Sequence, residues 1–330
     1  MKHHITHLLS FAAMFACAYT ASIFAQEHYP TATVTIQVVG EDGNPLVGFN
    51  VGSGFEIPNK NGVGTSAIGA QGVTNKEGRV TITRPTANGF VYYGSWAEGY
   101  YRTSNLTYQF KAHKDGQWTP SNPTLRVVLK RVGDPVPMYA RKVATEIPAV
   151  DQVIGFDLMI GDWVIPHGKG LRGDLLCKVV RRFVNWKDHD VALEITFPNE
   201  KDGLAPIIEK TPPTRGSELR LPRTAPEDGY RNKLATAIRR QPGGPSNEDA
   251  KTEMNYFFRV RTVLDEKGDI KSALYGKMHG DIRLDPINSK TSFIIFDSYL
   301  NPTPNDRNVE WDRSRNLATG LSDEQRPSAP

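Results

Sequence analysis

Thr33 to Gly48 read TVTIQVVGEDGNPLVG, and this stretch decides the fold class of the chain. Val34, Ile36 and Val38 alternate with polar residues, and such alternation of β-branched side chains predicts a half-buried strand. Residues 41–45 (EDGNP) follow. They predict a turn, because glycine and asparagine adopt positive φ and proline stops further pairing. We therefore expect a strand, a turn, and a second extended segment from residue 46.

Alternating segments of this kind recur along the chain. Residues 74–78 (TNKEG) predict another turn, and alternating apolar residues mark 125–129, 191–197, 256–261 and 293–299. Short strands with frequent turns are typical of sandwiches and barrels. We predict an all-β chain with two β-sandwich domains, the second of them antiparallel or jelly-roll-like. Only residues 231–240 have a pattern that suits a short helix.

Four motifs occur together within residues 31–131: the strand at 34–38, EDGNPLVG at 41–48, TNKEG at 74–78 and AEGY at 97–100. In this combination the segment resembles the carboxypeptidase regulatory-like, or transthyretin-like, β-sandwich. The resemblance implies a prealbumin-like fold and an accessory module of a secreted protein rather than a catalyst. The sequence departs from the family pattern at Asn75, where aspartate is commoner, and in a glycine-rich insertion over 52–72.

Residues 1–25 predict a secretory signal peptide. Lys2 supplies a positive start, an apolar run without charge follows over 8–24, and the small residue Ala25 suits cleavage. Two alternatives stay open. One is an uncleaved membrane anchor, although serine and threonine dilute the apolar run. The other is a lipidated Cys17. We expect a secreted or periplasmic protein, or one anchored in the cell envelope if Cys17 carries lipid.

The mature chain is long enough for two domains. Glycine and prolines at 133–148 predict a fairly stiff linker over 132–149, between a first domain at 31–131 and a second at 150–319. Residues 320–330 predict a disordered tail. Residues 199–250 are rich in proline, glycine and charge, and a stretch of this length is usually functional or disordered.

Composition excludes several classes of function. The formal net charge is +4, or +3 without Lys2, and no long basic run is present, so we expect no nucleic-acid partner. Cys177 is the only cysteine left after signal removal, and it reads as a buried thiol. No cofactor, metal or catalytic residue is assigned, because nucleotide, zinc-protease and nucleophile-elbow motifs are lacking and the histidines have no metal-ligand spacing.

Two loops hold the candidate ligand-binding residues. The loop at 161–170 carries Asp162, Trp163, His167 and Lys169. The acid and imidazole could act as an acid–base pair, the indole and ammonium could hold a glycan, or the loop is a rigid turn with a buried tryptophan.

The second loop, at 301–312, carries Asn305, Asp306, Arg307 and Trp311, which suit the hydroxyls of a sugar but also favour turns. A carboxylate pair for glycoside cleavage could come from Asp157, Asp162, Glu194, Asp281, Asp297 or Glu310.

A third group is aromatic and lies in the first domain: Phe90, Tyr92, Tyr93, Trp96, Tyr100 and Tyr101. Such rings can stack on sugars when they line an exposed sheet face. They are also enriched in strands, where they pack into the core, and core packing is the favoured interpretation here.

Three functional hypotheses follow. The first is an exported, non-catalytic envelope protein that binds a glycan or another surface protein. The second is an extracellular polysaccharide-active enzyme whose second domain is catalytic. The third is a structural or assembly component anchored through lipid on Cys17, the one case in which we expect a membrane partner.

Overall fold

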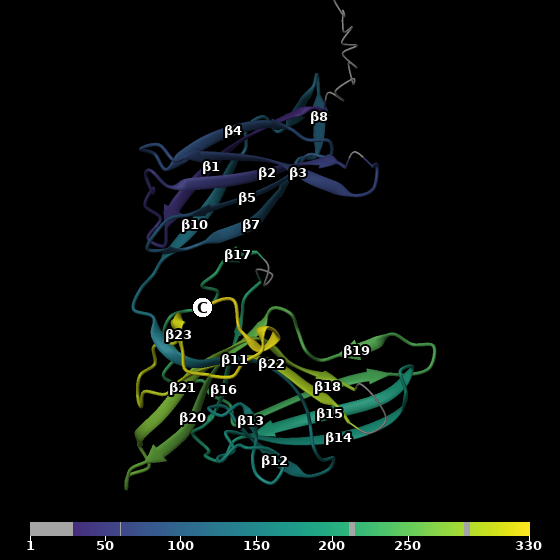
Figure 1. The fold of residues 1–330 in the computed structure, drawn as a ribbon, viewed down its shortest axis with the longest axis vertical. Coiled ribbons are helices and arrows are strands. Elements are labelled where there is room, and N and C mark those ends of the chain that lie inside the picture. Colours follow the sequence, from purple (N-terminus) through teal and green to yellow (C-terminus); the bar gives the residue numbers. More distant parts are fainter. Residues whose placement is uncertain (1–28, 60, 211–214, 287–290) are drawn as a thin grey trace, which may run out of the picture.

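The computed structural model describes residues 29–59, 61–210, 215–286 and 291–330. The predicted signal peptide and Cys17 lie outside these residues. Two β-sandwiches follow one another along the long axis of the molecule (Figure 1). In the described ranges the only helical segment is the 3-10 turn η1, Asp323–Gln325, and no helix is long and apolar enough to cross a membrane. The prediction of an all-β chain with two β-sandwich domains is confirmed.

The N-terminal domain packs a six-stranded sheet against a five-stranded one. The first sheet contains β1 Thr31–Gly40, β4 Arg79–Pro85, β6 Tyr100–Tyr101, β8 Ala112–Lys114, β9 Gln117–Thr119 and β10 Thr124–Arg131. The second contains β2 Asn50–Pro58, β3 Thr65–Val73, β5 Phe90–Trp96, β7 Thr103–Gln109 and, from the other half of the chain, β17 Gly216–Ser217. In the first sheet β1 pairs with β4 in antiparallel and with β10 in parallel.

The opening stretch of sequence builds this domain as its pattern predicts. Val34, Ile36 and Val38 are fully buried and pack in one core cluster with Phe55 from the facing sheet. In the turn that follows, Gly43 has a φ of 80°. Most of the glycine-rich insertion at 52–72 is not a loop but forms the paired strands of the β2–β3 hairpin.

The C-terminal domain packs two six-stranded sheets on each other. The first contains β11 Val136–Glu146, β16 Gly203–Ile208, β20 Met254–Leu264, β21 Ile270–Asp285, β22 Phe293–Asn301 and β23 Trp311–Asn316. The second contains β12 Val153–Asp157, β13 Asp162–Trp163, β14 Leu175–Asn185, β15 Asp188–Thr196, β18 Lys233–Arg240 and β19 Ser246–Glu248. Every pairing is antiparallel except that of β11 with β23.

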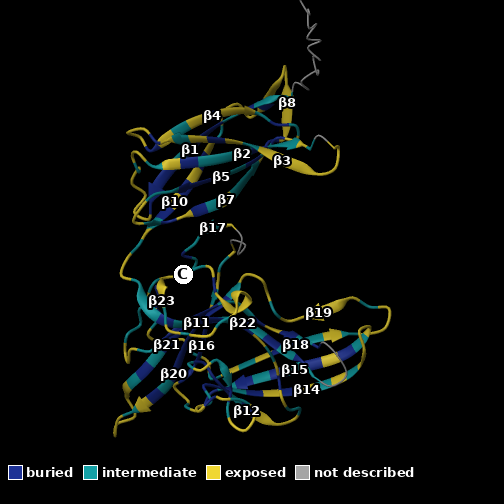
Figure 2. Cartoon of the chain, in the orientation of Figure 1, coloured by how far each residue is buried: buried dark blue, intermediate teal, exposed yellow. Residues whose placement is uncertain are grey.

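Buried and exposed residues alternate along many of these strands (Figure 2). Cys177 is fully buried in the core between the two C-terminal sheets, and burial raises the pKa of its thiol to about 12. The prediction of a buried thiol is confirmed.

Two predictions about local structure are wrong. The interval 132–149 is not a linker throughout, because β11 occupies 136–146 and pairs with β22 over eight residues. Both faces of β11 are covered, so the strand lacks a clear alternation, and Pro137 sits near its start, where a missing N–H is tolerated. The helix predicted within 231–240 is β18, paired with β15 from Lys233 to Arg240. Pairing within the sheet overrides the helix propensity of its alanines and arginines.

The prediction of a disordered tail is also wrong. Residues 320–330 fold back onto the C-terminal domain, where the Tyr299 hydroxyl donates to the Ala329 carbonyl over 2.9 Å, and Pro330 is buried. The segment 199–250 is ordered in its described part. It supplies β16, β18 and β19 to the C-terminal domain and sends β17 across to pair with β7 of the N-terminal domain.

Candidate functional site

The first predicted loop is a stabilised turn. The Asp162 carboxylate accepts hydrogen bonds from the backbone N–H groups of Trp163 and Lys169, over 2.8 and 2.9 Å. Trp163 is 3% exposed and its indole N–H donates to the Glu146 carbonyl. His167 and Lys169 are exposed on the outside of the turn. The Asp162 carboxylate is therefore engaged by the backbone of its own loop, and the indole faces the core.

The second predicted loop is held in the same way. The side-chain oxygen of Asn305 accepts from a backbone N–H of β21, and its side-chain nitrogen donates to a backbone carbonyl of the same strand. The Asp306 carboxylate accepts from the Asn308 backbone N–H over 2.9 Å. Arg307 donates to a backbone carbonyl and pairs with an exposed glutamate. Trp311 is 3% exposed. The two loops belong to different sheets of the domain, and neither supplies a lining residue to the hollows described below.

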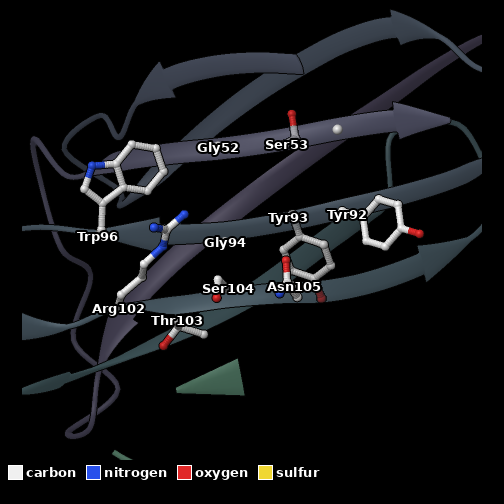
Figure 3. Close-up of a pocket in the computed structure, with 11 residues that line it drawn as sticks. Gly52, Ser53, Tyr92, Tyr93, Gly94, Trp96, Arg102, Thr103, Ser104 and Asn105 are labelled. Carbon is white, nitrogen blue, oxygen red and sulfur yellow. The ribbon is translucent and has the colours of Figure 1, made fainter. Parts of the chain in front are cut away.

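The aromatic group of the first domain does reach the surface in part. We name as the aromatic groove a hollow of about 170 Å³ on the outer side of β2, β5 and β7, lined by Gly52, Ser53, Gly54, Tyr92, Tyr93, Gly94, Trp96, Arg102, Thr103, Ser104 and Asn105. Figure 3 shows Trp96 and Tyr92 at either end, with Gly52 and Gly94 between them. The two glycines pair across β2 and β5 and leave the floor of the groove flat.

Fixed contacts position the rings of the groove. A Cβ added at Gly52 would lie 2.9 Å from the Trp96 ring, so this glycine makes room for the indole. The Arg102 guanidinium lies 5.5 Å from the centre of the same ring. At the other end the Tyr92 hydroxyl donates to the Glu56 carboxylate over 2.6 Å, and this hydrogen bond is the main reason the pKa of Tyr92 is raised.

The interpretation of the aromatic group as core packing therefore holds for part of it. Tyr101 is 8% exposed and Tyr93 packs against the core, whereas Trp96 and Tyr92 are partly exposed in the groove. Ligand pockets usually enclose about 300–1,000 Å³. At about 170 Å³, the aromatic groove is suited to one sugar ring of a longer ligand rather than to enclosing a whole small molecule.

A larger cavity, missed from the sequence, lies in the C-terminal domain. It encloses about 640 Å³ on the outer face of β11, β21 and β22. Its titratable lining residues include Lys142, Arg220, His279, Asp297 and Tyr299, and residues 328–329 of the chain end border it. We call it the C-terminal cavity.

The floor of the C-terminal cavity is a row across three strands. Lys142 on β11 pairs with Asp297 on β22, which pairs with His279 on β21. Burial raises the pKa of Asp297 to about 6, opposed by the charge of Lys142. Burial, together with the charges of Lys277 and Arg220, lowers the pKa of His279.

No sequence motif marks this row, because its three members are about 18 to 155 residues apart in the chain and meet only through strand register. Asp297 was one of several carboxylates open for glycoside cleavage, and the structure distinguishes it from most of them. Asp157 is held in a buried ion pair, Asp162 is held by its turn, and Glu310 is held at the domain interface. No group of three or more possible metal ligands occurs among the described residues.

The pH dependence of stability tests the state of Asp297. The folded protein keeps this carboxyl protonated up to about pH 6, whereas the unfolded chain ionises near its ordinary value of 3.8, so this residue makes the fold less stable as pH rises between those values. We expect Asp297→Asn to raise the melting temperature at pH 7.5 and to leave it unchanged at pH 3.5. Asp269→Asn, at an exposed turn position, is the matched control. If Asp297→Asn changed the melting temperature equally at both pH values, the raised pKa of Asp297 would be contradicted.

Comparison with known proteins identifies no family. No family model matches the chain, and no curated protein matches it. Among solved structures, the chain is similar to the shaft pilin spaA from Lactobacillus rhamnosus GG in a variant form, with 11% identity over 84% of this chain and 94% of that chain and a TM-score of 0.23. It is also similar to BcpA, the major pilin subunit of Bacillus cereus, with 10% identity over 82% and 96% and a TM-score of 0.21. At TM-scores this low, the similarity supports no inference about function.

Proposed function

We propose that this protein is an exported, non-catalytic protein of the cell envelope that binds a glycan through the aromatic groove. The observation that supports this most is the placement of Trp96 over Gly52, with Arg102 beside the ring. An indole offers a flat apolar surface to a sugar ring, and the polar groups around it supply hydrogen bonds to hydroxyls. The signal peptide predicted at 1–25 and the accessory role implied by the carboxypeptidase regulatory-like resemblance fit this function.

Removal of the indole tests the proposal. With a panel of soluble polysaccharides and the mature protein, we expect at least one ligand to bind and Trp96→Ala to weaken it by about ten-fold or more, equivalent to about 1.4 kcal/mol. Trp186→Ala is the matched control, because this indole is 55% exposed on the β14–β15 hairpin of the other domain. Equal binding by the two variants, or no bound polysaccharide at all, would reject the groove as a glycan site.

One observation favours a second function, that of a polysaccharide-active enzyme. Asp297 and His279 face each other on adjacent strands at the floor of a cavity of about 640 Å³. Proton transfer needs two such groups within reach of one substrate and a pKa near the working pH. Recording product release in the same panel separates the two functions. Release that disappears in Asp297→Asn would favour catalysis in the C-terminal cavity.

A further inference from the structure

Two more hollows are each lined by residues of both domains and of β17, the strand that lies between the two sandwiches in Figure 1. They enclose about 250 and 230 Å³ and share Arg215, Ser217 and Arg220 in their linings. Because the same three residues border both, we treat them as one feature, the interdomain groove. Its walls come from β7 and β10 of the N-terminal domain and, from the other half of the chain, from Glu209, residues 215–220, Arg313 and residues 328–329.

The interdomain groove is basic. Its charged lining residues are five cations, Arg126, Lys130, Arg215, Arg220 and Arg313, and two acids, Glu209 and Glu218. Five cations and two acids give the groove a formal net charge of +3, whereas the whole chain carries only +4. Positive charge is therefore concentrated at this junction, and a groove of one sign attracts ligands of the opposite sign.

Not all of this charge is engaged within the protein. The Lys130 ammonium donates to the Leu219 carbonyl over 2.7 Å, and Arg313 lies 3.6 Å from Glu218. Arg126 is exposed and makes no hydrogen bond or ion pair in the described part of the chain. Arg215 is exposed and donates once, to the Thr107 hydroxyl over 3.2 Å.

The two exposed guanidiniums therefore keep donors for a ligand. A guanidinium has five N–H donors in a planar fork, and this geometry matches a carboxylate or another planar or tetrahedral oxyanion in a bidentate contact.

The groove continues into both sites described above. It shares Thr103 and Ser104 with the aromatic groove, and Arg220 with the C-terminal cavity. A row of hollows thus runs from Trp96, with Arg102 at its side, past the domain junction to Asp297. A compact ligand would occupy one of these hollows. A row of them, basic in its middle section and aromatic at one end, is suited to a linear polymer with regularly spaced anions.

We propose that the glycan bound by this protein is an acidic polysaccharide, with a carboxylate or sulfate on successive sugar units, and that it lies along the interdomain groove in contact with both domains. This inference rests on the proposed glycan-binding function and adds the chemical class of the ligand. Trp96 stacks on one sugar ring of the polymer. Arg126 and Arg215 bind the anions of the units that follow.

The test compares polymers that share a backbone and differ in charge. We expect the mature protein to bind polygalacturonate and to bind the fully methyl-esterified polymer, which is uncharged, at least ten-fold more weakly. The double variant Arg126→Gln/Arg215→Gln should weaken polygalacturonate binding about ten-fold and reduce its dependence on salt, because fewer ion contacts form. Lys187→Gln/Lys267→Gln, at two exposed lysines in distant turns, carries the same change in net charge and should bind normally.

Sulfated dextran and poly-glutamate extend the test. The sulfated polymer could bind more tightly than polygalacturonate and lose this advantage in the arginine double variant. That result would support the interdomain groove as the binding site and identify sulfate as the preferred anion. Equal binding of poly-glutamate and polygalacturonate would overturn the inference, because the groove would then capture acidic chains without regard to sugar. Equal binding of the charged and esterified polymers would also overturn it. In that case, if Trp96→Ala still weakened polysaccharide binding, the proposed glycan-binding function would stand without the acidic ligand.

Discussion

Replacing Arg261 with methionine is expected to reduce the free energy of unfolding by about 3–5 kcal/mol at pH 7, the cost of leaving buried charges without their partner. Arg261 bridges two buried carboxylates. Its guanidinium lies 2.8 Å from Asp174 and 2.8 Å from Asp157, whose side chains are 1% and 3% exposed. Methionine fills similar space but provides no donors, so both acids lose their counter-charge.

The two acids respond differently to their surroundings. Burial raises the pKa of Asp174 despite the hydrogen bond from Arg261. Burial also acts to raise the pKa of Asp157. Hydrogen bonds from backbone N–H groups of the 158–172 loop and the charge of Arg261 outweigh this effect, so the pKa of Asp157 is lowered. Without Arg261 both ionised forms become less favourable in the fold. Protonation relieves this, so the loss of stability should be larger at pH 7 than at pH 4.

Urea denaturation at the two pH values measures this effect. Arg182→Met is the matched control, because Arg182 also pairs with an aspartate, Asp188, at 2.6 Å but on the surface. Solvent screens that pair, so its removal should change stability little. Similar losses in the two variants would show that burial of the Asp157–Asp174 cluster does not matter for stability.

The second large effect is expected at the junction of the domains. Glu310 is 1% exposed and lies 3.3 Å from Arg223. Its carboxylate accepts the Tyr101 hydroxyl over 2.7 Å and the Gly133 backbone N–H over 2.8 Å. One buried side chain therefore connects the N-terminal domain, the connector and the C-terminal domain. Arg223 also makes a two-pronged ion pair with Glu41, at 3.0 Å for each bond.

Glu310→Ala should cost about 3–5 kcal/mol, because Arg223 and the Tyr101 hydroxyl lose a buried partner. Glu310→Gln should cost less, since its amide oxygen can still accept from Tyr101 and Gly133, although its amide nitrogen faces a guanidinium. Chemical denaturation measures the loss, and limited proteolysis around 132–135 reports whether the connector opens. Glu98→Ala, at an exposed acid of the first domain, is the control. Unchanged proteolysis in Glu310→Ala would show that other contacts hold the domains together.

Local pattern was enough wherever a strand has one face in the core and one in solvent. Val34, Ile36 and Val38 alternate with threonine and glutamine and are buried as expected, and 191–197 form most of β15, in which buried and partly buried residues alternate. Pattern failed for β11 and β18. β11 has both faces covered, and β18 is composed of residues with good helix propensity, so neighbouring strands rather than local preference decide their conformation.

The candidate site could be predicted only in part. Polar loop residues such as Asp162 and Asn305 look like ligand contacts in a sequence, yet their side chains bond to nearby backbone groups, as aspartate and asparagine in turns commonly do. Trp96 was one of six aromatic residues for which core packing was the favoured interpretation, and its partial exposure depends on Gly52, which leaves room for the ring on the neighbouring strand. That neighbour is set by strand pairing, which sequence spacing does not reveal.

The sequence by itself determined the all-β class, the division into two sandwiches and the buried state of Cys177, because each follows from local alternation, turn residues and apolar composition. Only the tertiary structure decided which charges meet. Asp297 joins Lys142 and His279, Glu310 joins Tyr101 and Arg223, and Arg126 and Arg215 line the same interdomain groove. The physical reason is that strand register and domain packing bring together residues far apart in the chain, and these long-range contacts set the burial and the charge on which binding depends.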